Sequence, residues 1–512
     1  MIRLLKNNSN VSGFLLWFLL TLIVFAFINP FDIAIWRDRA YLMYMSQTIA
    51  RGTDLYATTP FGYTPLAAMV AGGIMSAIRF LNGTVDTILV SRLMGMGLYA
   101  CIIGSLFVLG RTITGNKRSA HLLSLLFLGF LFFSYVSAVN FEPKFLALLL
   151  QIWAMYSLVK TKHLQAGIFF SLAAMCWQPM VINCLVVIPF YLSIEGFTKS
   201  GFQKLSLFSL GVVAGTIPVL FYLSITNDWI HFWNQAVLRK TGYEGNALLD
   251  APLAWLLSII NPKLLLDSIP ILIGFLGVFL IGLNMFLKKP FLKTSLPYDG
   301  TLRLLYFLFF GWFFFNAMEF QGPMDLIPLL PVMLIFAILL MQKFITKLSS
   351  SHFRLVVVIV GIYALFDFAL PLKQATFTEQ KEYISDLKDR YGDAFVINFE
   401  EYYVLQQKPM PLYYMRMALF EDHLIDRFEP GGCAAILSQV KEMKPDFIIS
   451  RRTTGQRMSS IGKCGQKVLD TFSTTFYDTH EIASGQATPI KRSNKRFTYD
   501  VYKTQFHSIT LE

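Results

Sequence analysis

One carboxylate flanked by two arginines stands just after the first long apolar block of the chain. Asp38 lies between Arg37 and Arg39. A carboxylate in this position can act as a general base that removes a proton from an acceptor hydroxyl or amine. The guanidinium groups would keep it ionised and would also bind phosphate, which suits their planar fork. The alternative is an interfacial charge cluster that meets lipid headgroups.

A second acidic site occurs in the short segment Asn140–Lys144 (NFEPK). Glu142 is a candidate for a second catalytic or positioning carboxylate. The alternative is a helix cap, because Glu142 precedes Pro143 at the first turn of the next helix, where negative charge is favoured.

The segment 31–66 around Asp38 is too elaborate for a simple connector. It holds three arginines and four tyrosines, and long ordered loops usually have a function. Residues 38–50 contain no helix breaker, and Gly52 ends the predicted helix. One face of this helix carries Tyr41, Tyr44, Met45 and Thr48.

Long apolar blocks must position these residues. The chain has 512 residues, of which 55% are hydrophobic and only 15% charged, whereas soluble proteins carry about 25% charged residues. Blocks of about 18 residues are long enough to span hydrocarbon as helices. We predict eleven transmembrane helices, near 12–30, 93–110, 120–138, 145–159, 164–180, 182–194, 205–225, 264–287, 302–318, 326–341 and 355–371. The first block follows Arg3 and Lys6 and is read as a retained anchor, because no small-residue cleavage site follows it.

The distribution of basic residues fixes the predicted topology. With residues 65–80 as an interfacial or re-entrant segment, the loops on one side hold 13 basic residues and the opposing loops hold four. The positive-inside rule then places the basic loops in the cytoplasm. The loop 31–92 and the C-terminal residues face outward. The net charge of +12 is explained by this placement, so we expect no nucleic-acid partner.

Residues 375–512 are predicted to form a soluble α/β domain outside the membrane module of residues 1–374. Short strands are expected at 394–399, 446–450 and 496–503, with a helix at 434–443. Cys433 and Cys464 are the only two cysteines of this part. A pair in an oxidising compartment predicts a disulfide, and two free thiols are the alternative. No metal-ligand spacing is present.

These residues resemble the first outer loop of the GT-C membrane glycosyltransferases, in the branch of the aminoarabinose transferases and protein O-mannosyltransferases. The resemblance rests on an acidic residue after the first helix, a helix, a Gly-x-x-x-Tyr step and a Tyr-x-Pro turn. It also covers Arg92 at the start of the second helix, Glu142 and the late motif DLIPLLP. Its residues in the first loop are Arg37, Asp38, Arg39, Tyr41, Ala50, Arg51, Gly52, Asp54, Leu55, Tyr56, Tyr63, Thr64, Pro65 and Leu66. Tyr63-Thr64-Pro65 stands where the aminoarabinose branch has Lys-Pro-Pro.

The resemblance implies an enzyme that moves a sugar from a polyprenyl phosphate donor to a lipid, glycan or protein acceptor. The transfer would be an inverting displacement with Asp38 as general base and Glu142 assisting. Because no Asp-x-Asp or His-rich spacing marks a metal site, we expect no metal or other cofactor. Tyr41, Tyr56, Tyr63 and Pro65 would belong to the substrate loop. The leaving lipid phosphate would be neutralised by Arg37, Arg39, Arg92, Lys144, Arg239 or Lys240. The implied location is a bacterial inner membrane, with the outer face in the periplasm.

Three other classes remain as alternatives. A flippase or transporter of lipid-linked sugars would place ionisable residues and broken helices at the bilayer midplane, whereas here they gather at helix ends. A polymerase or ligase of another membrane class would need a large late outer loop, and residues 319–325 are few. A non-catalytic scaffold would not explain the first loop.

Overall fold

The computed structural model describes residues 9–27, 29–35, 37–58, 62–238, 265–286, 299–318, 323–369, 376–392, 394–397, 400–409, 431–453, 462–483 and 496–504. Two compact units are present. One comprises Met1–Ile28, Met94–Tyr222 and Tyr243–Leu370, and the other comprises Asn29–Leu93, Leu223–Gly242 and Pro371–Glu512. The sequence-based division at residue 375 remains a prediction. In the structure, the first loop (Asn29–Leu93) belongs to the same unit as the C-terminal residues.

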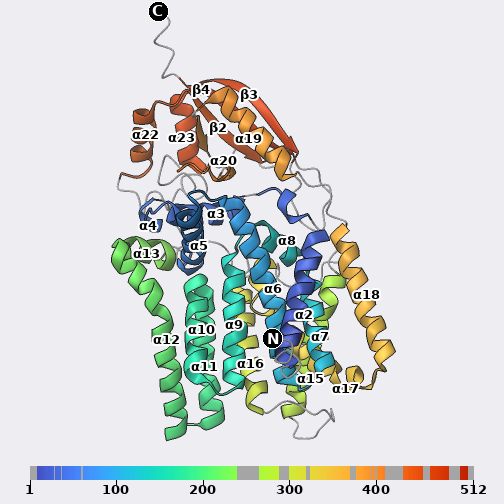
Figure 1. Cartoon of the computed structure of the whole chain (residues 1–512). Helices are drawn as coiled ribbons and strands as arrows, with labels where there is room; N and C mark the ends of the chain where they lie inside the picture. The colour runs from blue at the N-terminus through green and yellow to red at the C-terminus, as the bar shows by residue number, and fades with distance from the viewer. Residues whose placement is uncertain are drawn as a thin grey trace, which may run out of the picture. The chain divides into compact units, whose positions relative to one another are not determined.

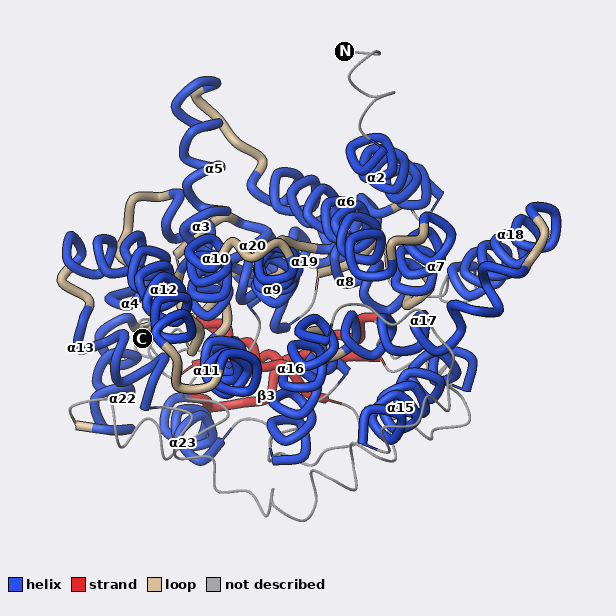
Figure 2. The backbone as a smooth tube through the Cα atoms, turned by 90° about the horizontal axis from the view of Figure 1, so that it is seen from below, coloured by secondary structure: helices blue, strands red, loops and turns tan. Residues whose placement is uncertain are grey.

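The first unit is built from apolar helices (Figure 1). They are α2 (Ser9–Phe27), α6 (Thr87–Thr114), α7 (Lys117–Leu128), α8 (Leu131–Val139), α9 (Pro143–Val159), α10 (His163–Cys176), η2 (Gln178–Met180), α11 (Val181–Glu195), α12 (Lys199–Thr226), α15 (Leu265–Phe286), α16 (Asp299–Met318), η6 (Pro323–Leu326), α17 (Leu330–Lys347) and α18 (Ser350–Ala369). Figure 2 looks along the axes of α9, α10, α11 and α16, which lie side by side. A helix satisfies its own backbone hydrogen bonds, as is required in the bilayer core, where no water is present to bond to N–H and C=O groups.

Six described helices are long and apolar enough to cross a membrane, and a seventh span results if α7 and α8 are one bent crossing. The protein is therefore a multi-pass α-helical membrane protein. Each of the eleven predicted segments holds a helix, but several of these are shorter apolar helices, so the number of crossings remains a prediction. The single helix predicted over 120–138 is corrected to two helices that meet at 65°. Gly129 ends α7, and its amide bonds back to Leu125 O at 3.0 Å.

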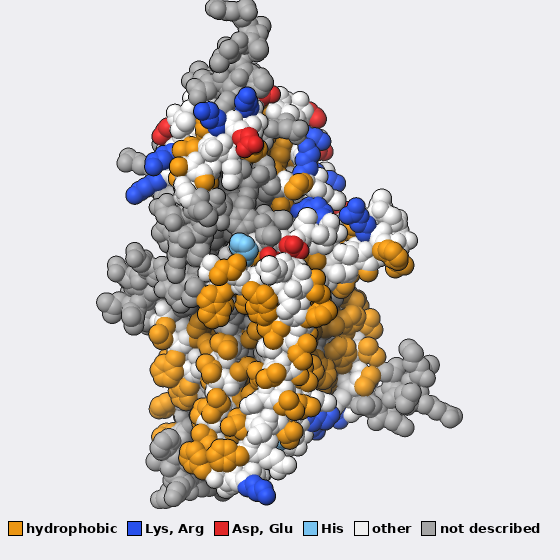
Figure 3. Space-filling view, turned by 90° about the vertical axis from the view of Figure 1, so that its left-hand side faces the viewer, with side chains coloured by type: hydrophobic (Ala, Val, Ile, Leu, Met, Phe, Trp, Pro, Cys, Tyr) orange, Lys and Arg blue, Asp and Glu red, His pale blue; other side chains and the backbone are white. Residues whose placement is uncertain are grey.

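Close backbone contact holds α10 against α12. A Cβ on Gly167 would lie 2.1 Å from Phe208 O, and one on Gly211 would lie 2.1 Å from Leu164 O. Small residues let membrane helices approach in this way. The opposite side of α12 exposes large apolar side chains, among them Leu210, Val213, Ile217, Phe221 and Ile225. Figure 3 shows hydrophobic side chains covering this helical part, as expected of a surface that faces lipid.

The second unit contains a four-stranded sheet of order β1-β2-β4-β3. Its strands are β1 (Phe395–Ile397), β2 (Phe447–Thr453), β3 (Ser473–Ala483) and β4 (Arg496–Thr504), and its C-terminal helices are α19 (Phe377–Tyr391), α20 (Glu400–Gln406), α22 (Gly432–Met443) and α23 (Gly462–Phe472). Strand β1 pairs with β2 in parallel, and the other pairs are antiparallel. The Tyr391 ring of α19 meets Phe447 of β2 edge to face at 5.2 Å.

The first loop forms η1 (Pro30–Asp32), α3 (Arg37–Ala50), α4 (Leu55–Thr58) and α5 (Leu66–Asn82). Hydrogen bonds tie it to the C-terminal residues of the same unit. Gln380 of α19 accepts from Ile35 N at 2.8 Å and donates to Ile35 O at 2.6 Å. Gln47 of α3 donates to Val404 O at 3.2 Å. Residues 40–48 of α3 are all buried, so both faces of this helix are covered, not only the predicted one.

Candidate functional site

Helix α3 presents the predicted base at its beginning. Asp38 is the second residue of α3, where a carboxylate is favoured by the positive end of the helix dipole. The structure describes the backbone of Arg37 and Asp38 but not their side chains, while Arg39 is half-buried. Arg239 and Lys240 lie outside the described residues. The catalytic and phosphate-binding roles of these residues remain predictions.

Three tyrosines of the first loop, Tyr41, Tyr44 and Tyr56, are buried, and Tyr63 is half-buried. Tyr41 is 2% exposed and Tyr56 is fully buried. The Tyr56 hydroxyl donates to Tyr63 O at 2.7 Å, which joins the two sides of the turn ahead of α5. Pro65 is the residue that precedes α5. These side chains therefore shape the predicted substrate loop, and direct contact with a substrate remains a prediction.

Arg92 is part of the packing of the first loop. Its side chain is 1% exposed and donates to Pro30 O at 2.7 Å and Ile33 O at 2.5 Å. Its guanidinium carbon also lies 4.3 Å from the centre of the Phe377 ring. These contacts fix the chain just ahead of α3, and a phosphate-binding role of Arg92 remains a prediction.

The structure reveals a further buried carboxylate, outside the residues predicted from the sequence. Asp228, at the start of α13 (Trp229–Phe232), is 2% exposed. Burial raises the pKa of its carboxyl, and the charge of Asp54 acts in the same direction. The Thr226 hydroxyl and the Tyr56 amide bond to the carboxylate and oppose this pKa shift. Its Oδ2 has no hydrogen-bond partner among the described residues. A sequence signal is present, because Asp228 lies two residues after the end of the long apolar helix α12.

The first unit holds Glu142 and Lys144 at the beginning of α9. Glu142 is 6% exposed and occupies the N-cap position, but its side chain makes no capping hydrogen bond. Lys144 Nζ lies 2.7 Å from Asp325 Oδ1 and 4.6 Å from the centre of the Trp177 ring. Asp325 belongs to the DLIPLLP motif, so the structure brings this motif to the second acidic segment.

A network of aromatic and amide side chains surrounds this ion pair. Trp177 stacks on Trp312 with ring centres 5.7 Å apart. The Trp312 indole donates to Asn183 Oδ1 at 2.8 Å, and Gln151 donates to Pro328 O at 2.8 Å. We call Lys144, Asp325, Trp177, Trp312 and Asn183 the Lys144 cluster.

Two fully buried amides add to the polar character of this unit. The side chains of Asn140 and Asn316 are 0% exposed, and their amide atoms have no partner among the described residues. Buried amides without partners are costly, so polar groups of a ligand or of water would be bound well there. Within the described ranges, no three His, Cys, Asp or Glu side chains are grouped as metal ligands.

The C-terminal cysteines lie in the second unit. Cys433 of α22 and Cys464 of α23 are joined in a disulfide, with their Cα atoms 5.6 Å apart. They are the pair selected from the sequence.

Comparison with solved structures shows that the chain shares the fold of ArnT. The chain is similar to ArnT from Cupriavidus metallidurans bound to undecaprenyl phosphate, with a TM-score of 0.54 and 11% identity over 95% of this chain and 97% of ArnT. It is also similar to the apo state of the same protein, with a TM-score of 0.57 and 11% identity over 96% and 98% of the two chains. No protein-family model and no curated protein matches the chain.

Proposed function

We propose that the protein is a membrane glycosyltransferase that uses a polyprenyl-phosphate sugar as donor. The observation that carries this proposal is the ArnT-like fold over nearly the whole chain. The solved ArnT holds undecaprenyl phosphate, which is the kind of lipid that the donor would leave behind. Buried charged and amide groups near helix ends provide polar surroundings for such a reaction.

The proposed reaction is a direct displacement at the anomeric carbon. Asp38 takes the proton of an acceptor hydroxyl, whose oxygen then forms the new glycosidic bond. The bond from the anomeric carbon to the phosphate oxygen breaks, and the polyprenyl phosphate leaves with that electron pair, which inverts the configuration. Charge on the leaving phosphate is the largest electrostatic demand of this step, and Arg37, Arg39 and Lys144 are the cations we assign to it.

Glu142 is assigned to the acceptor, since it is a buried carboxylate whose side chain does not cap α9. The acceptor is a lipid, a glycan or a protein. We place the enzyme in the inner membrane, with the C-terminal residues on the periplasmic side, because the positive-inside rule gives this orientation.

The test is transfer of a labelled sugar by purified protein in nanodiscs, with polyprenyl-phosphate sugars as donors and host lipid extract as acceptor. Asp38→Asn should reduce transfer by about 100-fold or more, as expected for loss of a general base. Asp386→Asn is the matched control, because Asp386 forms a largely exposed ion pair with Arg390 within α19. Activity of the wild type should survive EDTA. Equal activity of the two variants would refute Asp38 as the base, and flipping of the lipid-linked sugar without transfer would refute the enzyme class.

A further inference from the structure

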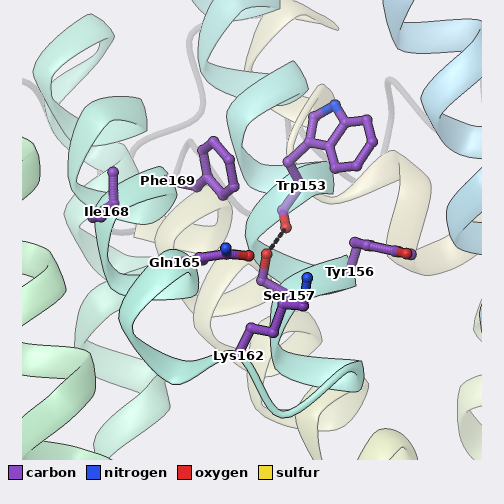
Figure 4. Close-up of a pocket in the computed structure, with 7 residues that line it drawn as sticks. All are labelled: Trp153, Tyr156, Ser157, Lys162, Gln165, Ile168 and Phe169. Atoms are coloured by element: carbon purple, nitrogen blue, oxygen red, sulfur yellow. Dashed lines mark hydrogen bonds between the residues drawn. The ribbon is translucent and has the colours of Figure 1, made fainter.

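The end of α9 far from Glu142 borders a cavity of about 270 Å³. It lies where α9 ends and α10 begins (Figure 4). Its polar lining residues include Ser157, Lys162 and Gln165, its apolar ones include Trp153, Ile168 and Phe169, and Tyr156 also lines it. Figure 4 shows the ends of the Lys162 and Gln165 side chains turned toward Ser157.

This cavity is separate from the residues assigned to sugar transfer. Glu142 and Lys144 stand at the first turn of α9, and the cavity borders its last two turns. A helix of 17 residues is about 25 Å long, close to the thickness of the hydrocarbon core. In the proposed topology the cavity therefore opens at the cytoplasmic leaflet.

The polar side of the cavity is suited to an anion. Lys162 is exposed and has no ion-pair partner among the described residues, and no acidic residue lines the cavity. Lys162 is also the N-cap of α10, where no side chain caps the helix. Free amide groups and the helix dipole at such an end favour a phosphate. The Ser157 hydroxyl donates to Trp153 O at 2.8 Å, so the contacts to the phosphate come from Lys162 and the amides of α10.

The apolar side of the cavity is suited to a hydrocarbon chain. Trp153, Ile168 and Phe169 come from two neighbouring helices and form this part of the wall. The volume of about 270 Å³ is smaller than that of typical sites for whole drug-sized ligands. It therefore has room for a headgroup and the first part of a chain, with the remainder lying in the bilayer.

We propose that this cavity binds an anionic glycerophospholipid of the inner leaflet. Lys162 and the first turn of α10 hold the phosphate, and Trp153, Ile168 and Phe169 contact the first methylene groups. Basic pockets between membrane helices on the cytoplasmic side bind lipid headgroups in this way. The site is independent of the proposed transfer reaction.

Native mass spectrometry of the full-length protein with added dioleoyl phosphatidylglycerol or dioleoyl phosphatidylcholine tests the proposal. The wild type should bind the first phosphatidylglycerol more tightly than phosphatidylcholine. Lys162→Gln should weaken phosphatidylglycerol binding by about fivefold, the value of one lysine near an anionic surface. Lys160→Gln is the matched control, because Lys160 is an exposed lysine of the same turn that does not line the cavity, and it should bind as the wild type does.

Three results would overturn the proposal. They are equal binding of the two lipids by the wild type, equal loss in the two lysine variants, and displacement of phosphatidylglycerol from this site by a lower concentration of polyprenyl phosphate. The last result would assign the cavity to the donor lipid.

Discussion

Lys144 lies between a carboxylate and an aromatic ring, and this position separates two roles for the residue. The Lys144–Asp325 pair is largely buried, with side chains 13% and 6% exposed. Removing one partner of a buried pair leaves the other charge without compensation and costs about 3–5 kcal/mol. Replacing both partners by apolar residues of similar volume is often neutral. The contribution of the Lys144–Asp325 pair to stability can therefore be measured separately from the role of Lys144 in activity.

We predict that Asp325→Leu and Lys144→Met each lower the melting temperature in detergent, whereas the double variant recovers most of the loss. Transfer activity should remain lost in the double variant, because Lys144 is assigned to the leaving phosphate. An active double variant would show that the lysine serves only the packing of the Lys144 cluster.

Asp228 predicts a dependence of stability on pH. Its carboxyl has a raised pKa in the folded chain, so the folded state binds the proton more tightly than the unfolded state. The stability from this group is fully present below the ordinary Asp pKa of 3.8 and is lost as the pH rises through the higher folded pKa.

Asp228→Asn removes the ionisation. In thermal unfolding scans, its melting temperature should decline less than that of the wild type as the pH rises from 4 to 7. Parallel declines would contradict the prediction.

At the scale of elements, the crossing of α10 and α12 depends on glycine. A Cβ at Gly167 would meet backbone atoms of α12, with Phe208 O only 2.1 Å away, and backbone cannot move aside as a side chain can. Gly167→Ala should destabilise the protein by about 2 kcal/mol or more. The matched control is Gly97→Ala in α6, where nothing lies within 4 Å of a new Cβ. Thermal unfolding in detergent measures the stability of both variants. Equal melting temperatures of the two variants would show that α10 and α12 can move apart without loss of stability.

Several elements could be predicted from the sequence because their signals are local. Runs of apolar residues revealed each long helix, and alternation with turn residues located β1, β2 and β4 close to their observed places. The break between α7 and α8 was missed because Gly129-Phe130 lies in a continuous apolar run, and hydropathy does not register a bend. Helix α19 was missed although Thr376 and Glu379 form a capping box at its start.

The site was harder to predict than the elements because its partners are distant in the chain. Lys144 and Asp325 are separated by 181 residues, and only folding shows that they pair. Asp38 and Glu142 were selected from local context. Arg92 is predicted to bind phosphate, and its described partners include the carbonyl groups of Pro30 and Ile33 and the Phe377 ring. No sequence pattern distinguishes a buried arginine that binds carbonyl groups from one that binds a phosphate.

At the scale of the whole molecule, the orientation of the chain in the membrane links the proposals. Sugar transfer is assigned to the outer side and lipid binding to the inner side, so both depend on the same parity of crossings. The disulfide between Cys433 and Cys464 agrees with an outward C-terminus, because disulfides persist in oxidising compartments. The 13 basic residues of the opposite loops agree with a cytoplasmic position for those loops.

Reporter fusions test this orientation directly. Alkaline phosphatase fused after Glu512 should be active, because the enzyme folds only where its own disulfides form. Green fluorescent protein fused after Lys347, at the end of α17, should fluoresce, since this end carries basic residues assigned to the cytoplasm. Each reporter moved to the other position serves as the control and should be silent. The reverse pattern would mean that residues 65–80 cross the membrane. Asp38 would then stay on the outer side, whereas Glu142 and Lys144 would move to the cytoplasmic side, which would separate residues assigned to one reaction. The cavity at Lys162 would lie in the outer leaflet.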